Sequence, residues 1–275
     1  MKTIVAATNF SEDSFNAVQY AADMACVTGT DLLLVHVCPY PVVVTEAPAA
    51  FYGIEELVAN AEQEIRLVKD RIAARSGDRI KISTVVKEGD IIEGIDEACA
   101  SVNTYVVVIG RSEKSEFQRF LLGSKTVAAT RQLAWPLVTV PPGAHFAGIR
   151  NIGVACDFRH VIETLPANEI KSIVRAYGAK LHVLHVSHET ADAFSSRTIE
   201  ESGWFQDLLG ELHPQYHFIN GTDTGAGIID FADKAQLDML IVIPKKHDLV
   251  GKVFKHSHSR QLVLHAHIPI MAIHE

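Results

Sequence analysis

Short apolar runs alternate with longer amphipathic segments along the 275 residues of the chain. Runs of Val, Ile and Leu are typical of strands covered on both faces, and their alternation with helical segments predicts a parallel sheet. In the first half, the pattern predicts strands near residues 2–8, 31–37, 80–86, 104–109 and 136–140. It predicts helices near residues 13–28, 54–75, 90–101 and 124–133. Ser11 is suited to cap the first helix, and Gly29 to end it.

The second half of the chain repeats this order of elements. The stretch K-T-I-V-A-A-T-N-F-S (2–11) aligns with R-N-I-G-V-A-C-D-F-R (150–159), and D-L-L-L-V-H-V (31–37) aligns with K-L-H-V-L-H-V (180–186). The pattern predicts strands near residues 151–155, 180–186, 215–219, 239–243 and 269–273. It predicts helices near residues 161–177, 196–212, 226–236 and 257–265. An internal repeat of this kind indicates two copies of one domain.

The segment P-P-G-A-H-F-A-G-I, residues 141–149, separates the two copies. Its two prolines and two glycines mark a break between domains. We therefore expect an α/β fold of two tandem flavodoxin- or Rossmann-like domains, residues 1–142 and 149–275. Each domain would hold a five-stranded parallel sheet with helices on both faces.

Composition and charge narrow the classes of partner. The net charge of -8 argues against non-specific binding to nucleic acid or to an anionic membrane surface. No apolar run approaches the roughly 20 residues of a membrane-spanning helix, and the first residues lack the layout of a signal peptide. The four cysteines contain no C-x-x-C pair, which is typical of small buried side chains in a reducing compartment. We predict a cytoplasmic protein.

Candidate ligand-binding residues follow the carboxyl ends of the predicted strands. Ligands of open parallel sheets bind at this edge, where the strand order reverses. Thr8 and Asn9 end the first strand, Val37 ends the second, and Gly110 with Arg111 ends the fourth. If the fourth strand lies beside the first, these ends surround one crevice. Gly123, Ser124 and Lys125 then open the next helix, whose free N–H groups favour a phosphate.

These stretches together resemble the universal stress protein family in its tandem form. The matching features are A-T-N-F-S-E-D-S before a helix, L-L-L-V-H-V, V-V-V-I-G, L-L-G-S and W-P-L-V-T-V, with weaker counterparts in the second half. The resemblance implies a stress-response module that acts through a nucleotide or a protein partner. It also implies pairing of the two halves through their last strands, giving an intramolecular pseudo-dimer, and leaves a further homodimer open.

The resemblance also supplies a nucleotide motif. ATP-binding members of the family carry a loop of the form G-x-x-G-x9-G-[ST], onto which Gly110, Gly123 and Ser124 map at the expected spacing. Glu113 replaces the second glycine, and Asn9 replaces an aspartate that contacts the nucleoside. Asn9 retains an acceptor and adds two donors.

Glu113 is the more serious departure. A carboxylate about 4 Å from a phosphate oxygen costs roughly 4 kcal/mol at a surface-like dielectric constant, which is close to a thousandfold in affinity. Arg111, Lys114 and Lys125 are near enough in sequence to offset part of this cost. ATP or a related adenine nucleotide in the first domain is therefore one hypothesis. The alternative is that Gly110 and Gly123 only permit a tight loop.

The second copy of the loop is more degenerate. Pro244 stands at the position of Gly110 and lacks an N–H group, and His256-Ser257 replaces Gly-Ser one residue early. Lysines and histidines in this stretch are interpreted as a solvated basic loop. Asp157, at the position of Asn9, is interpreted as a cap or turn residue.

Histidines are concentrated in the second half. Strand periodicity puts His182 and His188 on one face of their strand and His185 on the other. His185 aligns with His36, which indicates a repeated structural role, with the imidazole hydrogen-bonded at a strand end. A zinc site would need three or four converging ligands, and we assign none.

The sequence also lacks the motifs of nucleophilic catalysis. We expect a non-catalytic or weakly catalytic module, with a slow ATPase activity at most. A pure interaction module that binds an unidentified protein partner and no nucleotide, or a slow nucleotide hydrolase, remain the alternatives.

Overall fold

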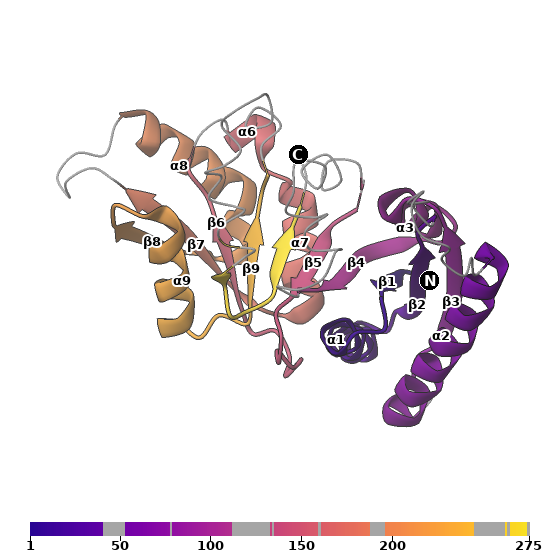
Figure 1. Cartoon of the computed structure of the whole chain (residues 1–275). Coiled ribbons are helices and arrows are strands. Elements are labelled where there is room, and N and C mark those ends of the chain that lie inside the picture. The colour runs from indigo at the N-terminus through magenta and orange to yellow at the C-terminus, as the bar shows by residue number, and fades with distance from the viewer. Residues whose placement is uncertain are drawn as a thin grey trace, which may run out of the picture. The chain divides into compact units, whose positions relative to one another are not determined.

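The computed structural model is described here for the residues 1–40, 53–77, 79–111, 133, 135–158, 161–187, 196–244, 262 and 265–273. These residues form two compact units, Met1–His145 (unit 1) and Phe146–Glu275 (unit 2). Each unit alternates strands and helices, as the apolar runs predict (Figure 1). The fold is therefore α/β in both units.

Unit 1 is built on a parallel sheet with the strand order β3-β2-β1-β4-β5. Its strands are β1 (Thr3–Ala7), β2 (Asp31–Cys38), β3 (Ile82–Glu88), β4 (Thr104–Gly110) and β5 (Leu137–Val140). Its described helices are α1 (Glu12–Thr28), α2 (Ile54–Ser76) and α3 (Ile91–Ala100). Helices α1 and α2 contact each other. Helix α3 packs with one apolar face of the sheet, which includes Val5, Val35 and Val107.

The ends of α1 follow from local chemistry. Ser11 has an extended backbone, and its side chain accepts a hydrogen bond from the N–H of Ser14. At the other end, Gly29 takes the left-handed conformation, with φ of 63°, and donates its N–H to the carbonyl of Ala25. Both predicted caps are confirmed. The helix therefore starts directly after the turn that follows β1.

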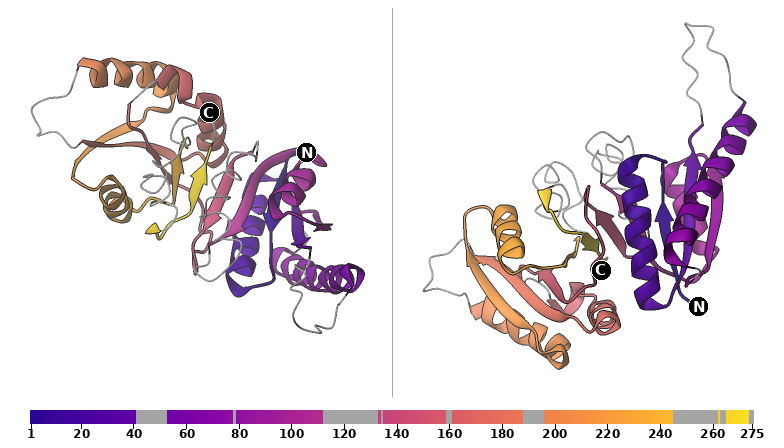
Figure 2. Two further views of the ribbon diagram at one scale, coloured as in Figure 1. Left: turned by 45° about the horizontal axis from the view of Figure 1, so that its top comes forward. Right: turned by 90° about the horizontal axis from the view of Figure 1, so that it is seen from below.

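Unit 2 repeats the arrangement with the order β10-β9-β6-β7-β8, again parallel. Its strands are β6 (Asn151–Ala155), β7 (Lys180–Ser187), β8 (Gln215–Asn220), β9 (Met239–Val242) and β10 (Ile270–Ala272). Its described helices are α6 (Val161–Thr164), α7 (Ala167–Tyr177), α8 (Ser196–Leu209), continued by the 3₁₀ turn η1 (Gly210–Leu212), and α9 (Thr224–Lys234). Helix α9 covers one face of the sheet, and α7 and α8 cover the other (Figure 2).

One helix prediction is wrong in detail. The segment 161–177 was expected to be continuous, but it is divided into α6 and α7. Pro166 lies at the break, where it can neither donate an N–H nor tolerate the carbonyl of the preceding turn. Predicted helices near 124–133 and 257–265 fall almost entirely outside the described residues. Among the helices that are described, none has both the length and the apolar character needed to cross a membrane.

Candidate functional site

The strand order of unit 1 reverses between β1 and β4, which are direct neighbours. Thr8 and Asn9 follow β1, and Gly110 and Arg111 stand at the end of β4. The condition set by the sequence, that the fourth strand lies beside the first, is thus met. The carboxyl ends of these two strands form the edge at which doubly wound sheets bind ligands.

Thr8 holds the turn that follows β1. Its N–H donates to the carbonyl of Val35 on β2, at 2.9 Å. Its hydroxyl lies 3.1 Å from the hydroxyl of Ser14 and accepts the N–H of Phe10 at 3.0 Å. The residue is only 6% exposed. The polar atoms of Thr8 are therefore used within the fold.

Asn9 is exposed at the same turn, and its side chain has a defined orientation. Its Oδ1 accepts both the N–H of Ser11, at 3.2 Å, and the Ser11 hydroxyl, at 2.6 Å. An amide nitrogen cannot accept a hydrogen bond, so the N–H of Ser11 identifies the atom that faces it as Oδ1 and the other as Nδ2. Nδ2 makes no hydrogen bond to the residues that the structure describes. It is the atom of Asn9 that remains for a ligand.

His36 connects this turn to β2. Its Nδ1–H donates to the carbonyl of Thr8 at 2.8 Å, and its ring stacks on Phe10 with the centroids 4.3 Å apart. Burial lowers the pKa of His36 from 6.5, and the hydrogen bond to Thr8 opposes that shift. Phe10 itself has a positive φ of 64°, a conformation that L-residues rarely adopt. The ring contact and the hydrogen bonds hold it there.

Two of the predicted site residues, Val37 and Gly110, have clear packing roles, and a third, Arg111, is held through its backbone. Val37 is 8% exposed, and a Cβ on Gly94 would come within 2.8 Å of its side chain, so Val37 is packed against α3. A Cβ on Gly110 would lie 2.5 Å from the carbonyl oxygen of Asp13 in α1. Arg111 donates its N–H to Val140 at 2.8 Å. Gly110 thus allows α1 to approach the end of β4.

The rest of the predicted nucleotide loop is not described. Glu113, Gly123, Ser124 and Lys125 all lie outside the described residues, as do His188 and the basic loop of the second half. The candidate site therefore consists, in the described part of the chain, of the two strand ends and the turn from Thr8 to Ser11.

Unit 2 contains the same turn with different side chains. The N–H of Cys156 donates to Leu184 at 3.0 Å, and the N–H of Phe158 donates to the sulfur of Cys156 at 3.3 Å. His185 donates from Nδ1 to the carbonyl of Cys156 at 3.1 Å, and its ring lies 4.9 Å from that of Phe158. The predicted structural role shared by His36 and His185 is confirmed.

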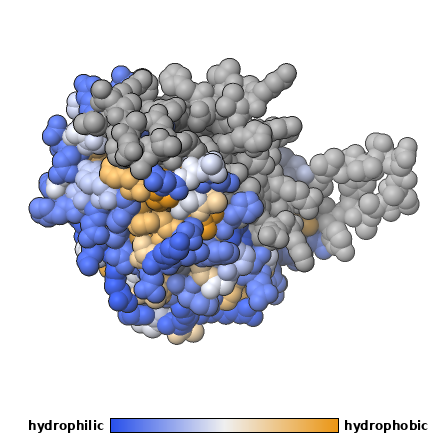
Figure 3. Space-filling model, turned by 90° about the vertical axis from the view of Figure 1, so that its left-hand side faces the viewer, coloured by the Kyte–Doolittle hydropathy of each residue, from blue (hydrophilic) through white to orange (hydrophobic). Residues whose placement is uncertain are grey.

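The surroundings of this second turn are aromatic. Phe158 is 2% exposed, because Phe205 of α8 meets its ring edge-on at 5.8 Å. Phe218 of β8 lies 6.3 Å from Phe158 on another side and is itself 47% exposed. Figure 3 shows apolar surface within a hydrophilic surround on the side of the molecule where β8 lies. The turn of unit 2 is thus sealed by the unit's own side chains.

On the face of β7 opposite to His185, His182 lies beside His217 of the neighbouring strand β8. His182 Nδ1 is 3.0 Å from His217 Nε2 of β8, and the ring of His217 packs 4.5 Å from Phe231 of α9. Burial lowers the pKa of both imidazoles, and for His182 the neighbouring His217 and Lys180 add to the effect. Among the described residues, no group of three His, Cys, Asp or Glu side chains could hold a metal ion.

The cysteines are free thiols. Cys38 and Cys99 are buried, whereas Cys26 and Cys156 are half-buried. Burial raises the pKa of Cys99 to about 12, so this thiol stays protonated at neutral pH. Buried cysteines therefore act as small apolar side chains, as the sequence indicates.

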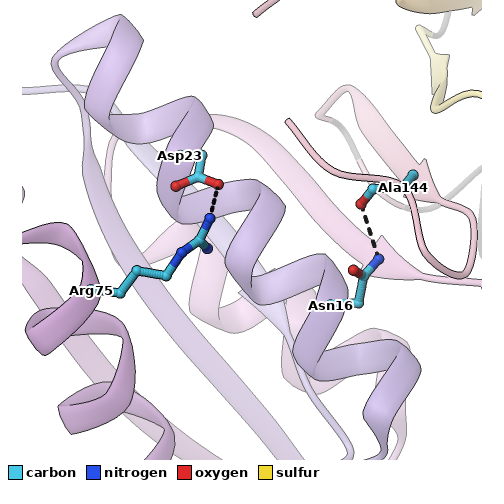
Figure 4. Close-up of polar contacts among 4 residues, drawn as sticks. All are labelled: Asn16, Asp23, Arg75 and Ala144. Carbon is cyan, nitrogen blue, oxygen red and sulfur yellow. Dashed lines mark hydrogen bonds and ion pairs between the residues drawn. The ribbon is translucent and has the colours of Figure 1, made fainter. Parts of the chain in front are cut away.

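Helix α1 is fixed along its length by polar contacts (Figure 4). Asp23 forms an ion pair with Arg75 of α2 at 2.6 Å. Near the start of the helix, the amide of Asn16 donates to the carbonyls of Pro141 at 3.4 Å and Ala144 at 3.2 Å. These contacts tie the helix that begins at the candidate site to α2 and to the segment that leaves β5.

Comparison with solved structures supports the fold. The chain is similar to a universal stress protein from Archaeoglobus fulgidus DSM 4304, with a TM-score of 0.72 and 20% identity over 99% of this chain and 96% of that chain. For a functionally unknown protein from Pseudomonas aeruginosa PAO1, the TM-score is 0.62 and the identity 13%, over 100% and 92% of the two chains. A universal stress protein from Archaeoglobus fulgidus in complex with dAMP matches with a TM-score of 0.33 and 18% identity, over 45% and 97%.

Comparison with curated proteins gives no match. The model of the universal stress protein family, in contrast, matches the chain twice, over residues 1–141 and over residues 148–274. The two matches are consecutive and together cover nearly the whole sequence. The chain therefore belongs to the universal stress protein family, as a tandem of two such domains.

Proposed function

We propose that unit 1 binds ATP or a related adenine nucleotide at the carboxyl edge of β1 and β4. The observation that carries the proposal is the reversal of strand order between these strands, beside a sequence that retains Gly110, Gly123 and Ser124 of the family's nucleotide motif. The proposed site also includes Thr8, Asn9, Val37, Arg111 and Lys125.

The hydrogen bonds at the carboxyl edge of β1 and β4 indicate a role for each residue of the proposed site. Because Oδ1 of Asn9 is engaged by Ser11, we assign Asn9 as a donor, through Nδ2, to a ribose oxygen. Thr8 shapes the turn, and Val37 supports the edge from the core. The positive side chains of Arg111 and Lys125 offset the charge of a phosphate. The role that remains is binding, with nucleotide turnover slow or absent.

Unit 2 is proposed to lack this activity. Pro244 follows β9 at the position of Gly110 and has no N–H to offer a phosphate.

The four free cysteines fit a reducing, cytoplasmic location. Three further statements stay predictions: that the chain binds a protein partner, that its two units form an intramolecular pseudo-dimer through their last strands, and that it forms a homodimer.

The test is the thermal shift of the full chain on addition of ATP. We expect Gly123→Asp to abolish the shift, because a carboxylate enters the proposed phosphate cradle. Glu113→Gly should enlarge it, since a repulsion of roughly 4 kcal/mol at about 4 Å would be removed. His256→Asp, at the aligned position of the second half, is the matched control and should leave the shift unchanged.

Two outcomes would contradict the proposal. If the wild-type chain carries no nucleotide on purification and shows no shift with ATP, the interaction-module alternative is favoured. If the purified chain hydrolyses ATP and Glu113→Gln abolishes the turnover, the protein is a hydrolase with Glu113 as its base.

A further inference from the structure

A partly open pocket of about 340 Å³ lies between α1 and α2 of unit 1 and is bordered by Phe10. Phe10, Phe15 and Val68 supply its apolar lining, and Leu67, which is 49% exposed, stands at its border. This volume is at the lower end of the range for small-molecule sites, roughly 300–1,000 Å³. We call it the α1–α2 groove. It shares Phe10 with the turn of the proposed nucleotide site, but its other lining residues come from α1 and α2.

Charged groups form the rim of the α1–α2 groove. Glu12 and Glu64 contribute carboxylates, and Arg71 contributes a guanidinium whose Cζ lies 5.9 Å from the ring centroid of Phe15. None of these three side chains forms an ion pair with another residue that the structure describes. The rim thus has an excess of one negative charge, and both carboxylates are exposed.

Unit 2 indicates what kind of group fits such a space. The two turns share their hydrogen bonds, but Phe158 is sealed by the ring of Phe205 from the helix that follows the second strand of the unit. The corresponding helix of unit 1, α2, contains no aromatic residue between Ile54 and Ser76. Val68 and Leu67 line the groove instead. In unit 1, the helix that follows the second strand therefore supplies no ring beside Phe10.

We propose that the α1–α2 groove binds a small molecule that joins an aromatic ring to a positively charged amine. The ring occupies the space beside Phe10 and Phe15, where aromatic groups pack edge-to-face or offset. The amine faces Glu12 and Glu64, whose charge exceeds that of Arg71. A volume of about 340 Å³ suits a compact ligand rather than the broad surface that a protein partner covers.

Fluorine NMR on the full chain tests the proposal with three matched probes. 5-Fluorotryptamine carries a ring and an amine, 5-fluoroindole carries the ring alone, and 5-fluoroindole-3-acetate carries a ring and an anion. For an amine with about 13 non-hydrogen atoms, we expect a Kd on the order of 1 mM or tighter. The amine should bind about threefold to fivefold more tightly than the neutral ring, because an exposed ion pair contributes up to about 1 kcal/mol. The anion should bind most weakly.

Substitutions in the α1–α2 groove test whether the probes bind there. Val68→Phe places a ring in the groove from the chain itself and should weaken binding of 5-fluorotryptamine by tenfold or more. Glu12→Gln with Glu64→Gln should remove the preference for the amine but retain binding of 5-fluoroindole. Glu62→Gln is the matched control, because the carboxylate of Glu62 faces Arg66 on the same helix at 3.5 Å rather than the groove. It should leave all three affinities unchanged.

The proposal is overturned by any of three results. One is the absence of 5-fluorotryptamine binding at several millimolar. The second is tightest binding of the anionic probe, which would assign the rim to Arg71. The third is binding that survives Val68→Phe in a protein whose thermal unfolding is otherwise normal. If Val68→Phe does not fold, the double glutamine variant decides the matter through the loss of amine preference.

Discussion

Phe10 in unit 1 borders an open groove, whereas Phe158 in unit 2 is 2% exposed. Both residues have positive φ, 64° and 49°, and both rings contact a histidine whose Nδ1 donates to the carbonyl two residues before the phenylalanine. The backbone of the turn is thus the same, and the difference lies in the helices around it. Hydrogen bonds at the strand end define this turn, while packing decides whether it is accessible.

The contacts between each turn and its first helix differ in the same way. In unit 1, the hydroxyl pair of Thr8 and Ser14 ties the end of β1 to a continuous α1. In unit 2, Cys156 replaces Thr8, and sulfur is a weaker acceptor. The aligned helix is interrupted at Pro166, and Ile162, at the position of Ser14, is 60% exposed. The hydroxyl pair that ties the end of the first strand to the first helix is therefore found in unit 1 and not in unit 2.

Phe205→Ala should have the largest effect, because it opens in unit 2 the space that is open in unit 1. Phe205 is 0% exposed and packs on Phe158, so truncation removes a buried ring and leaves a cavity. We expect a loss of about 3–5 kcal/mol in the free energy of unfolding. Urea denaturation followed by Trp204 fluorescence measures it. Leu67→Ala, at the partly exposed border of the groove in unit 1, should cost far less. Equal losses would contradict the difference in packing.

Gly110→Ala should have the next largest effect and should act on unit 1. The new Cβ would lie 2.5 Å from the carbonyl oxygen of Asp13, a backbone atom that cannot move without shifting α1. We expect a loss of about 2–3 kcal/mol, measured by urea denaturation with Trp135 as the probe. Pro244→Ala, at the aligned position of unit 2, serves as the control and should change stability by no more than about 0.5 kcal/mol. A neutral Gly110→Ala would show that α1 is not held against β4.

The pH dependence should give the smallest effect. The pKa values of His182 and His217 lie below 6.5 in the folded chain, so the unfolded chain binds protons more readily as the pH falls through 6.5. Stability of unit 2 is full above that pH and declines below it. We therefore expect the Tm of unit 2 to be lower at pH 5.5 than at pH 7.5.

Unit 1 supplies the matched variant for this experiment. Leu33 and Val85 occupy the positions aligned with His182 and His217, and both belong to the apolar packing against α3. His182→Leu with His217→Val should therefore reduce the acid sensitivity measured at Trp204. The acid sensitivity of unit 1, measured at Trp135, should persist in this variant. It comes in part from His36, whose pKa is also lowered by burial. An unchanged pH profile at Trp204 would exclude the histidine pair as the source.

The sequence is sufficient to predict most of the fold. Apolar periodicity locates each described strand within about two residues, and the repeat identifies the two domains, because both depend on local side-chain patterns. The break between α6 and α7 was missed although Pro166 signals it. The repeated role of His36 and His185 was found because it depends on alignment of the two halves.

The candidate site was predicted less completely. Placing Thr8, Asn9 and Gly110 at one edge requires only the strand order. Sequence spacing does not show that Ser11 engages Oδ1 of Asn9, or that Gly110 is small because α1 approaches it. The α1–α2 groove brings Phe10, from the turn before α1, together with Val68 of α2, and such contacts depend on tertiary packing rather than on local pattern.

The amide of Asn16 has a structural consequence. Its two hydrogen bonds attach residues 141–144, the start of the connection to the second domain, to α1. The side chain of Asn16 therefore links the helix that starts at the candidate site to the segment through which the chain leaves the first domain.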